Sequence, residues 1–147
     1  MTLETSTAFG AEQLDEENPR YSIDVKAFEA SGKSFAYAIY TRMSERGMAQ
    51  LGGTADAPPR PLGTPSEYMK VIASVCSREP DYMLPGTPIS EAVFRLLLSH
   101  NNRPMTLQEI QGGLAAAWAS VIYLKNLSDD VVRRMLDLPN EYFIRRV

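Results

Sequence analysis

The sequence predicts a mainly α-helical protein with a small β element, an α+β fold. Two observations support this prediction. Apolar residues recur at helical spacing in several stretches of the 147-residue chain, and most of these stretches follow a Ser, Thr or Asp, the residues that cap helix N-termini. Short alternating or aromatic stretches at 21–25 and 142–147 have instead the period and residue types of strands.

Residues 1–20 are polar and acidic, and we expect them to form a disordered arm. An acidic segment that docks on a basic partner or mimics nucleic acid is the alternative. Residues 21–46 form an expected strand and helix segment, with the helix from about Ser34 to Arg46. The "SGKS" at 31–34 lacks the preceding glycine of a phosphate-binding loop, so a plain loop is predicted there.

Residues 47–65 are rich in Gly, Pro and Ala and predict a linker. Pro58, Pro59 and Pro61 in this stretch are also compatible with a polyproline II ligand for an aromatic groove. More often such a run is only a stiff connector.

Residues 66–147 are expected to form one helical domain. Its first helix begins at Ser66 and places Cys76 on the apolar side, where a cysteine is usually a small buried hydrophobe. A catalytic thiol needs a base, and His100 is the only histidine in the chain. We interpret His100 as the end of the next helix, where the helix dipole favours its charged form.

Three further helix starts follow in the sequence of this domain. Ser90 is the expected cap of the first, with Glu91 in its first turn. Thr106 and Glu109 have the spacing of a capping box at the second, and Ser128 precedes the third. Gly112 and Gly113 interrupt the apolar stripe of the second helix. The side chains that we expect in the core are Phe94, Leu97, Ile110, Leu114, Trp118, Val121, Met135, Leu136 and Phe143.

The order helix, short extended "RPMT", helix, helix, strand is that of a winged-helix domain. The segment "EAVFRLLLSHNNRPMTLQEIQ" resembles the opening of such domains, and "VVRRMLDLPNEYFIRRV" resembles their third helix running into the first wing strand. The likeness is to the HARE-type helix-turn-helix group. Two features depart from the pattern: residues 113–126 are longer than a minimal second helix and turn require, and no return strand follows Val147.

Composition limits the possible functions. The net charge is −3 with a pI of about 5.2, which argues against a general binder of polyanions. One histidine and one cysteine cannot supply the usual ligands of a structural zinc site, and no nucleotide-binding or hydrolase motif occurs. We therefore expect no enzyme, with no catalytic, cofactor-binding or metal-binding residues. No secretory signal or membrane span is predicted, and the cytoplasm is the expected compartment.

The candidate contact residues are Arg133, Arg134, Arg145 and Arg146, on the third helix and the last strand. In a winged helix these two elements flank the DNA groove. Each helical arginine also has an acidic residue four positions away, and such pairs stabilise an exposed helix and repel phosphate. Two hypotheses follow: a non-catalytic protein–protein interaction or scaffold module, and a DNA-binding transcriptional regulator.

Overall fold

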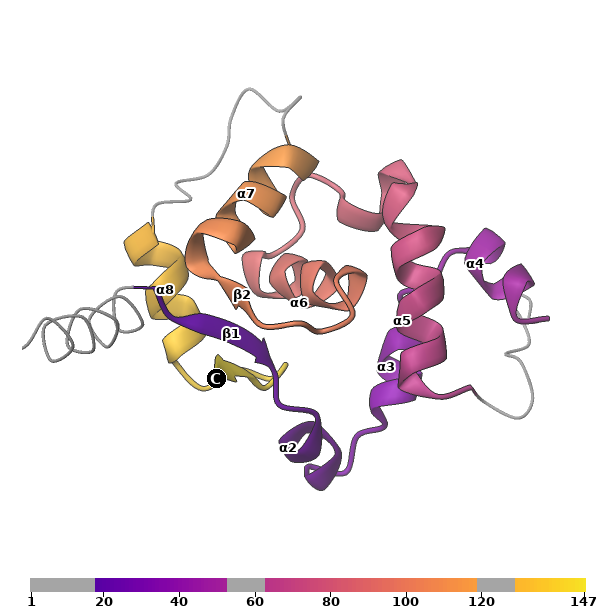
Figure 1. Ribbon diagram of the computed structural model, residues 1–147, viewed down its shortest axis with the longest axis horizontal. Coiled ribbons are helices and arrows are strands. Elements are labelled where there is room, and N and C mark those ends of the chain that lie inside the picture. The colour runs from indigo at the N-terminus through magenta and orange to yellow at the C-terminus, as the bar shows by residue number, and fades with distance from the viewer. Residues whose placement is uncertain (1–17, 53–62, 119–128) are drawn as a thin grey trace, which may run out of the picture.

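The computed structural model describes residues 18–52, 63–118 and 129–147. In these residues the fold is α+β, mainly helical with a small antiparallel sheet (Figure 1), as the sequence predicts. The elements in chain order are β1 (Arg20–Ile23), α2 (Val25–Ala30), α3 (Phe35–Tyr40), α4 (Glu45–Gln50), α5 (Pro65–Ser74), the 3₁₀ turns η1 (Cys76–Arg78) and η2 (Pro80–Met83), α6 (Ile89–Ser99), β2 (Met105–Thr106), α7 (Leu107–Ala117), α8 (Asp129–Asp137) and β3 (Ile144–Arg146).

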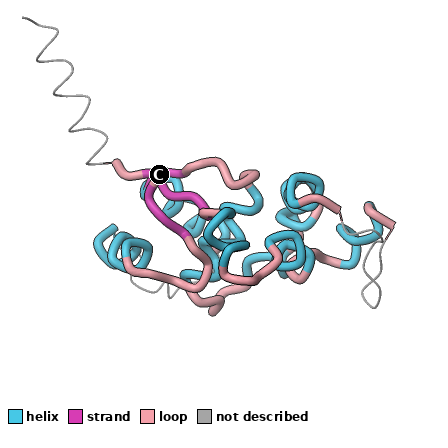
Figure 2. Tube along the Cα trace, turned by 90° about the horizontal axis from the view of Figure 1, so that it is seen from below, coloured by secondary structure: helices cyan, strands magenta, loops and turns pink. Residues whose placement is uncertain are grey.

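The sheet has the order β2-β1-β3, so the strand nearest the N-terminus lies at its centre. Tyr21 lies opposite Met105 on one side and opposite Arg146 on the other. The Val147 N–H donates to the Arg20 carbonyl at 2.9 Å and continues the ladder beyond β3. The antiparallel partner of β3 is therefore a strand that precedes every helix in the described part of the chain, and Figure 2 shows the three strands together at one side of the molecule.

Two asparagine side chains bind backbone groups that the strands leave unpaired, one on the central strand β1 beyond the end of β2 and one on β3. The Asn102 amide accepts from the Ile23 N–H at 2.8 Å and donates to the Ile23 carbonyl at 3.0 Å. At the outer edge of β3, the Asn140 amide accepts from the Ile144 N–H and donates to the Ile144 carbonyl, both at 3.0 Å. Asn102 has a φ of 55°, a left-handed conformation that asparagine tolerates better than most residues. Exposed strand edges invite pairing with other chains, and these side chains occupy the backbone groups that would do so.

Helix α6 lies at the centre of the core, packed against α5, α7, α8 and β1. Its apolar residues cover most of its circumference, and Val93, Phe94 and Leu97 are fully buried. The expected core residues that are buried are Phe94, Leu97, Ile110, Leu114, Trp118 and Leu136. Met135 and Phe143 are only partly buried, and Val121 lies outside the described residues.

Helix α7 begins with the predicted capping box. The Glu109 N–H donates to Thr106 Oγ1 at 3.1 Å, and the Thr106 N–H donates to Glu109 Oε1 at 2.9 Å. The helix runs through Gly112 and Gly113 without interruption. A Cβ on Gly113 would lie 2.7 Å from Leu96 Cδ1, whereas one on Gly112 would meet nothing within 4 Å. Gly113 thus allows α7 to approach α6 closely.

Three predicted boundaries are wrong. The expected helix over 34–46 is two short helices, because the chain turns after Tyr40 and Ser44 caps a new helix by accepting from the Gly47 N–H at 3.1 Å. Thr64, not Ser66, caps α5. Ser90 lies inside α6, which begins at Ile89 after Pro88 without a side-chain cap. Proline fixes an extended entry, so this helix needs no polar residue to start it.

Candidate functional site

Helix α8 presents two of the four predicted contact residues. Val132 and Leu136 are buried and fix the inward face of the helix. Arg134 is exposed, and Arg133 is half-buried with its Nε enclosed and without a hydrogen-bond partner among the described residues. The two arginines therefore lie on different sides of the helix, one in solvent and one against the protein.

The other two predicted residues point to opposite faces of the sheet, as neighbours in a strand do. Arg145 Nη1 lies 3.1 Å from Asp24 Oδ2. Arg146 binds Asp137 with two hydrogen bonds of 2.8 and 2.7 Å, and the Tyr21 hydroxyl donates to the same carboxylate at 2.9 Å. The hydrogen bonds from Arg146 lower the pKa of Asp137. Both strand arginines are thus neutralised by acidic residues of this chain.

The expected ion pairs along α8 are not those that form. Among the described residues, Asp137 pairs with Arg146 and not with Arg133, and no ion pair joins Asp130 to Arg134. The side chain of Asp129 lies outside the described part of the chain, so its expected pair with Arg133 does too. Because Arg146 presents two parallel donors to Asp137, it takes the carboxylate in preference to the single contact available along the helix.

We use the name α8–β3 surface for α8, the connecting residues 138–143 and β3. It contains a pocket of about 530 Å³. Leu138 lines this pocket and is 64% exposed, one of the most exposed large apolar side chains described. The other lining residues are Leu136, Asp137, Pro139, Asn140, Phe143, Ile144, Arg145 and Arg146. The pocket lining thus combines apolar side chains with the charged residues Asp137, Arg145 and Arg146.

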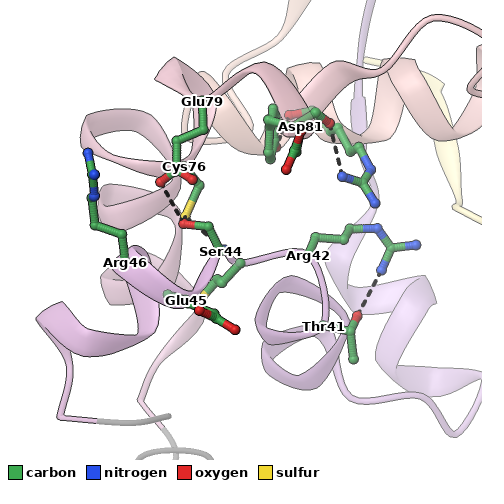
Figure 3. Close-up of a pocket in the computed structure, with 11 residues that line it drawn as sticks. Thr41, Arg42, Ser44, Glu45, Arg46, Cys76, Glu79 and Asp81 are labelled. Carbon is green, nitrogen blue, oxygen red and sulfur yellow. Dashed lines mark hydrogen bonds between the residues drawn. The ribbon is translucent and has the colours of Figure 1, made fainter. Parts of the chain in front are cut away.

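A second pocket, of about 640 Å³, lies between the α3–α4 turn and the 3₁₀ turns (Figure 3). Ser44 points towards Cys76 and Glu79 there: its hydroxyl donates to Glu79 Oε1 at 2.8 Å and accepts from the Gly47 N–H. Cys76 is buried, as predicted, and its Sγ lies 3.4 Å from the Ser44 nitrogen. Because the Ser44 hydroxyl already caps α4, it is occupied as a structural group.

Beside this pocket lies a partly buried charged network that sequence reasoning missed. Glu91 accepts two hydrogen bonds of 2.8 Å from Arg42, one of 2.7 Å from Arg95 and one of 2.9 Å from the Tyr142 hydroxyl. Burial alone would raise the pKa of Glu91, but the hydrogen bonds from the two arginines outweigh it and lower the pKa to about 2. Burial and the bond to Glu91 raise the pKa of Tyr142 to about 12. The network ties the α3–α4 turn, α6 and the residues before β3 together.

The remaining polar candidates are occupied by structural contacts. His100 caps α6, and its Nδ1 lies 2.9 Å from the Leu96 carbonyl. In the described ranges, no group of three His, Cys, Asp or Glu residues is placed to hold a metal ion. No helix within those ranges has the length and apolar character needed to cross a membrane.

Comparison of the chain with protein-family models, with curated proteins and with solved structures gives no match. The functional interpretation therefore depends on the geometry of the α8–β3 surface.

Proposed function

We propose that this chain is a non-catalytic protein–protein interaction or scaffold module, and that the α8–β3 surface is its contact surface. The observation that supports this is the distribution of charge and apolar side chains on that surface. Its four arginines lie among acidic residues, with Asp130, Asp137 and Glu141 on the surface and Asp24 beside it, and its pocket is lined by Leu138, Pro139 and Phe143 as well as by charged residues. Apolar side chains together with polar and charged ones are the usual composition of a protein interface.

We also propose that the core is winged-helix-like. The order α6, β2, α7, α8, β3 is the order that the resemblance implies, and β1 pairs with β3 as its antiparallel neighbour. Fold alone does not assign a function, so the proposal depends on the surface. The cytoplasm is the proposed location, since a chain with one buried cysteine suits a reducing compartment.

The second candidate is a DNA-binding transcriptional regulator. The observation in its favour is that α8 packs beside β3, so that a helix with Arg134 exposed on it adjoins a strand with two arginines. Against it, Arg145 and Arg146 would have to leave Asp24 and Asp137 to reach phosphates.

A titration of labelled duplex DNA at two salt concentrations separates the two functions. If the interaction module is right, binding stays in the non-specific range of about 10⁻⁴–10⁻⁶ M at physiological salt. Submicromolar binding that falls steeply with salt would favour the regulator, provided that it is lost when Arg133, Arg134, Arg145 and Arg146 are all replaced by alanine. The matched control replaces Arg46 and Arg78, which are exposed on other elements.

A further inference from the structure

The α8–β3 surface carries both a projecting apolar side chain and a pocket able to receive one. Leu138 is 64% exposed directly after the last turn of α8. The pocket that it lines, about 530 Å³, is much larger than a leucine side chain and is walled on other sides by Pro139 and Phe143. Val131, one of the other exposed apolar residues, lies two helical turns earlier on the same face of α8 as Leu138.

The charges of this surface allow it to face a copy of itself. Residues 130–147 contain four arginines and three acidic residues, and Asp24, which directly follows β1, pairs with Arg145 of β3. A surface with one sign of charge would repel its copy, whereas this one presents both signs in near-equal number. Asp130 and Arg134 are both exposed and are not paired with each other. A rotated second copy can therefore offer each of them an opposite charge.

The structure also disfavours the other common mode of self-association through this region, in which the edge strands of two sheets pair. The outward N–H and carbonyl of Ile144 are already bonded to the Asn140 side chain. β3 has only three residues, and Arg145 turns its backbone groups towards β1, so that Arg146 is the one residue of β3 whose outward backbone groups the Asn140 side chain does not bind. Contact with a partner is thus left to side chains of α8 and of residues 138–143.

Building on the function proposed above, we propose that the partner of the α8–β3 surface is a second copy of this chain. The two copies are related by a twofold axis, and Leu138 of each is seated in the pocket of the other. A twofold interface uses the same surface on both subunits, so it requires one that contains both the projecting group and its receptor. The α8–β3 surface meets this requirement, and the opposite charges at its rim pair across the axis.

Sedimentation velocity of the full chain, over a concentration series from about 1 to 300 µM, tests the proposal. We expect a monomer–dimer equilibrium that shifts towards the dimer as concentration rises. Leu138→Arg should raise the dimer Kd on the order of 100-fold, because each dimer loses a central contact twice. Leu138 is exposed, so the variant should keep the circular dichroism spectrum and melting temperature of the wild type.

Leu84→Arg is the matched control. Leu84 is 51% exposed and lies after η2, away from the pocket, so its substitution should leave the dimer Kd unchanged. Concentration-dependent shifts of the Leu138 methyl resonances in nuclear magnetic resonance spectra give a second measurement that needs no variant.

Two results would overturn the self-association: a wild-type chain that stays monomeric throughout the series, or a dimer that Leu138→Arg leaves intact. The first result leaves the interaction module standing if Leu138→Arg abolishes binding of a different protein partner. Submicromolar, arginine-dependent binding of duplex DNA would instead overturn the interaction module itself. The two proposals therefore fail by different measurements.

Discussion

Replacing Glu91 with glutamine removes one negative charge from the network that joins the α3–α4 turn, α6 and the residues before β3. The side chain keeps its size, but Arg42 and Arg95 lose their shared counter-ion in a site where both are largely buried. The pKa of Glu91 falls from 4.5 in a free carboxyl to about 2. Each pKa unit corresponds to about 1.4 kcal/mol, so the ionised carboxylate contributes roughly 3 kcal/mol to the free energy of unfolding. This agrees with the roughly 3–5 kcal/mol lost when one partner of a buried pair is removed.

The sign of the pH dependence follows from the direction of the shift. Because folding lowers the pKa of Glu91, the stabilisation is fully present above about pH 4.5 and is lost as the pH falls towards 2. Urea unfolding of the wild type and of Glu91→Gln at pH 7 should differ by roughly 3 kcal/mol. The difference should shrink as both are measured at progressively lower pH.

Glu29→Gln is the control, since Glu29 is exposed on α2 and should change stability by no more than about 0.5 kcal/mol. The reasoning fails if Glu91→Gln is as stable as the wild type at pH 7. A difference that stays constant down to pH 2 would also refute it, because the loss would then not arise from the charge.

Two further predictions concern α6 and α7. Gly113→Ala gains the same helix propensity as Gly112→Ala, but its Cβ meets Leu96, so it should be less stable than Gly112→Ala by about 1–3 kcal/mol. Gly112 lies in the same helix with open space around it, so Gly112→Ala should stabilise the protein by up to about 1 kcal/mol. Equal effects of the two substitutions on the melting temperature would show that α7 does not approach α6 as described. Leu97 is fully buried, so Leu97→Ala should lower the free energy of unfolding in urea by about 2–5 kcal/mol. A decrease below about 1 kcal/mol would contradict its place in the core.

The local features of the fold could be predicted from the sequence because their signals lie within a few residues. The capping box needs only Thr106 and Glu109, three positions apart. The apolar residues of α6 recur at helical spacing, and this spacing alone predicts that Phe94 and Leu97 face the core. The end of α6 at His100 follows from the residues just after it.

The features that the sequence did not reveal join residues far apart in the chain. Arg42 and Glu91 are 49 positions apart, and the charge of either is equally compatible with a solvated helix face. Only the i,i+4 spacing of Glu91 and Arg95 was visible as a signal, and it says nothing about burial. Likewise, the candidate arginines were correctly placed on α8 and β3, but their partners Asp24 and Asp137 depend on the sheet register.

The central position of β1 has a consequence for the order in which the molecule folds. Asp24 and Arg145, which meet beside the sheet, are 121 residues apart, whereas α6 and α7 are neighbours in the chain and close only a short loop. Contacts between distant residues must offset a larger loss of chain entropy before they stabilise anything. We therefore expect the helical centre to form first. β1 then pairs with β2, which lies between α6 and α7, and with β3 near the end of the chain. On this argument the sheet is the last part of the protein to form.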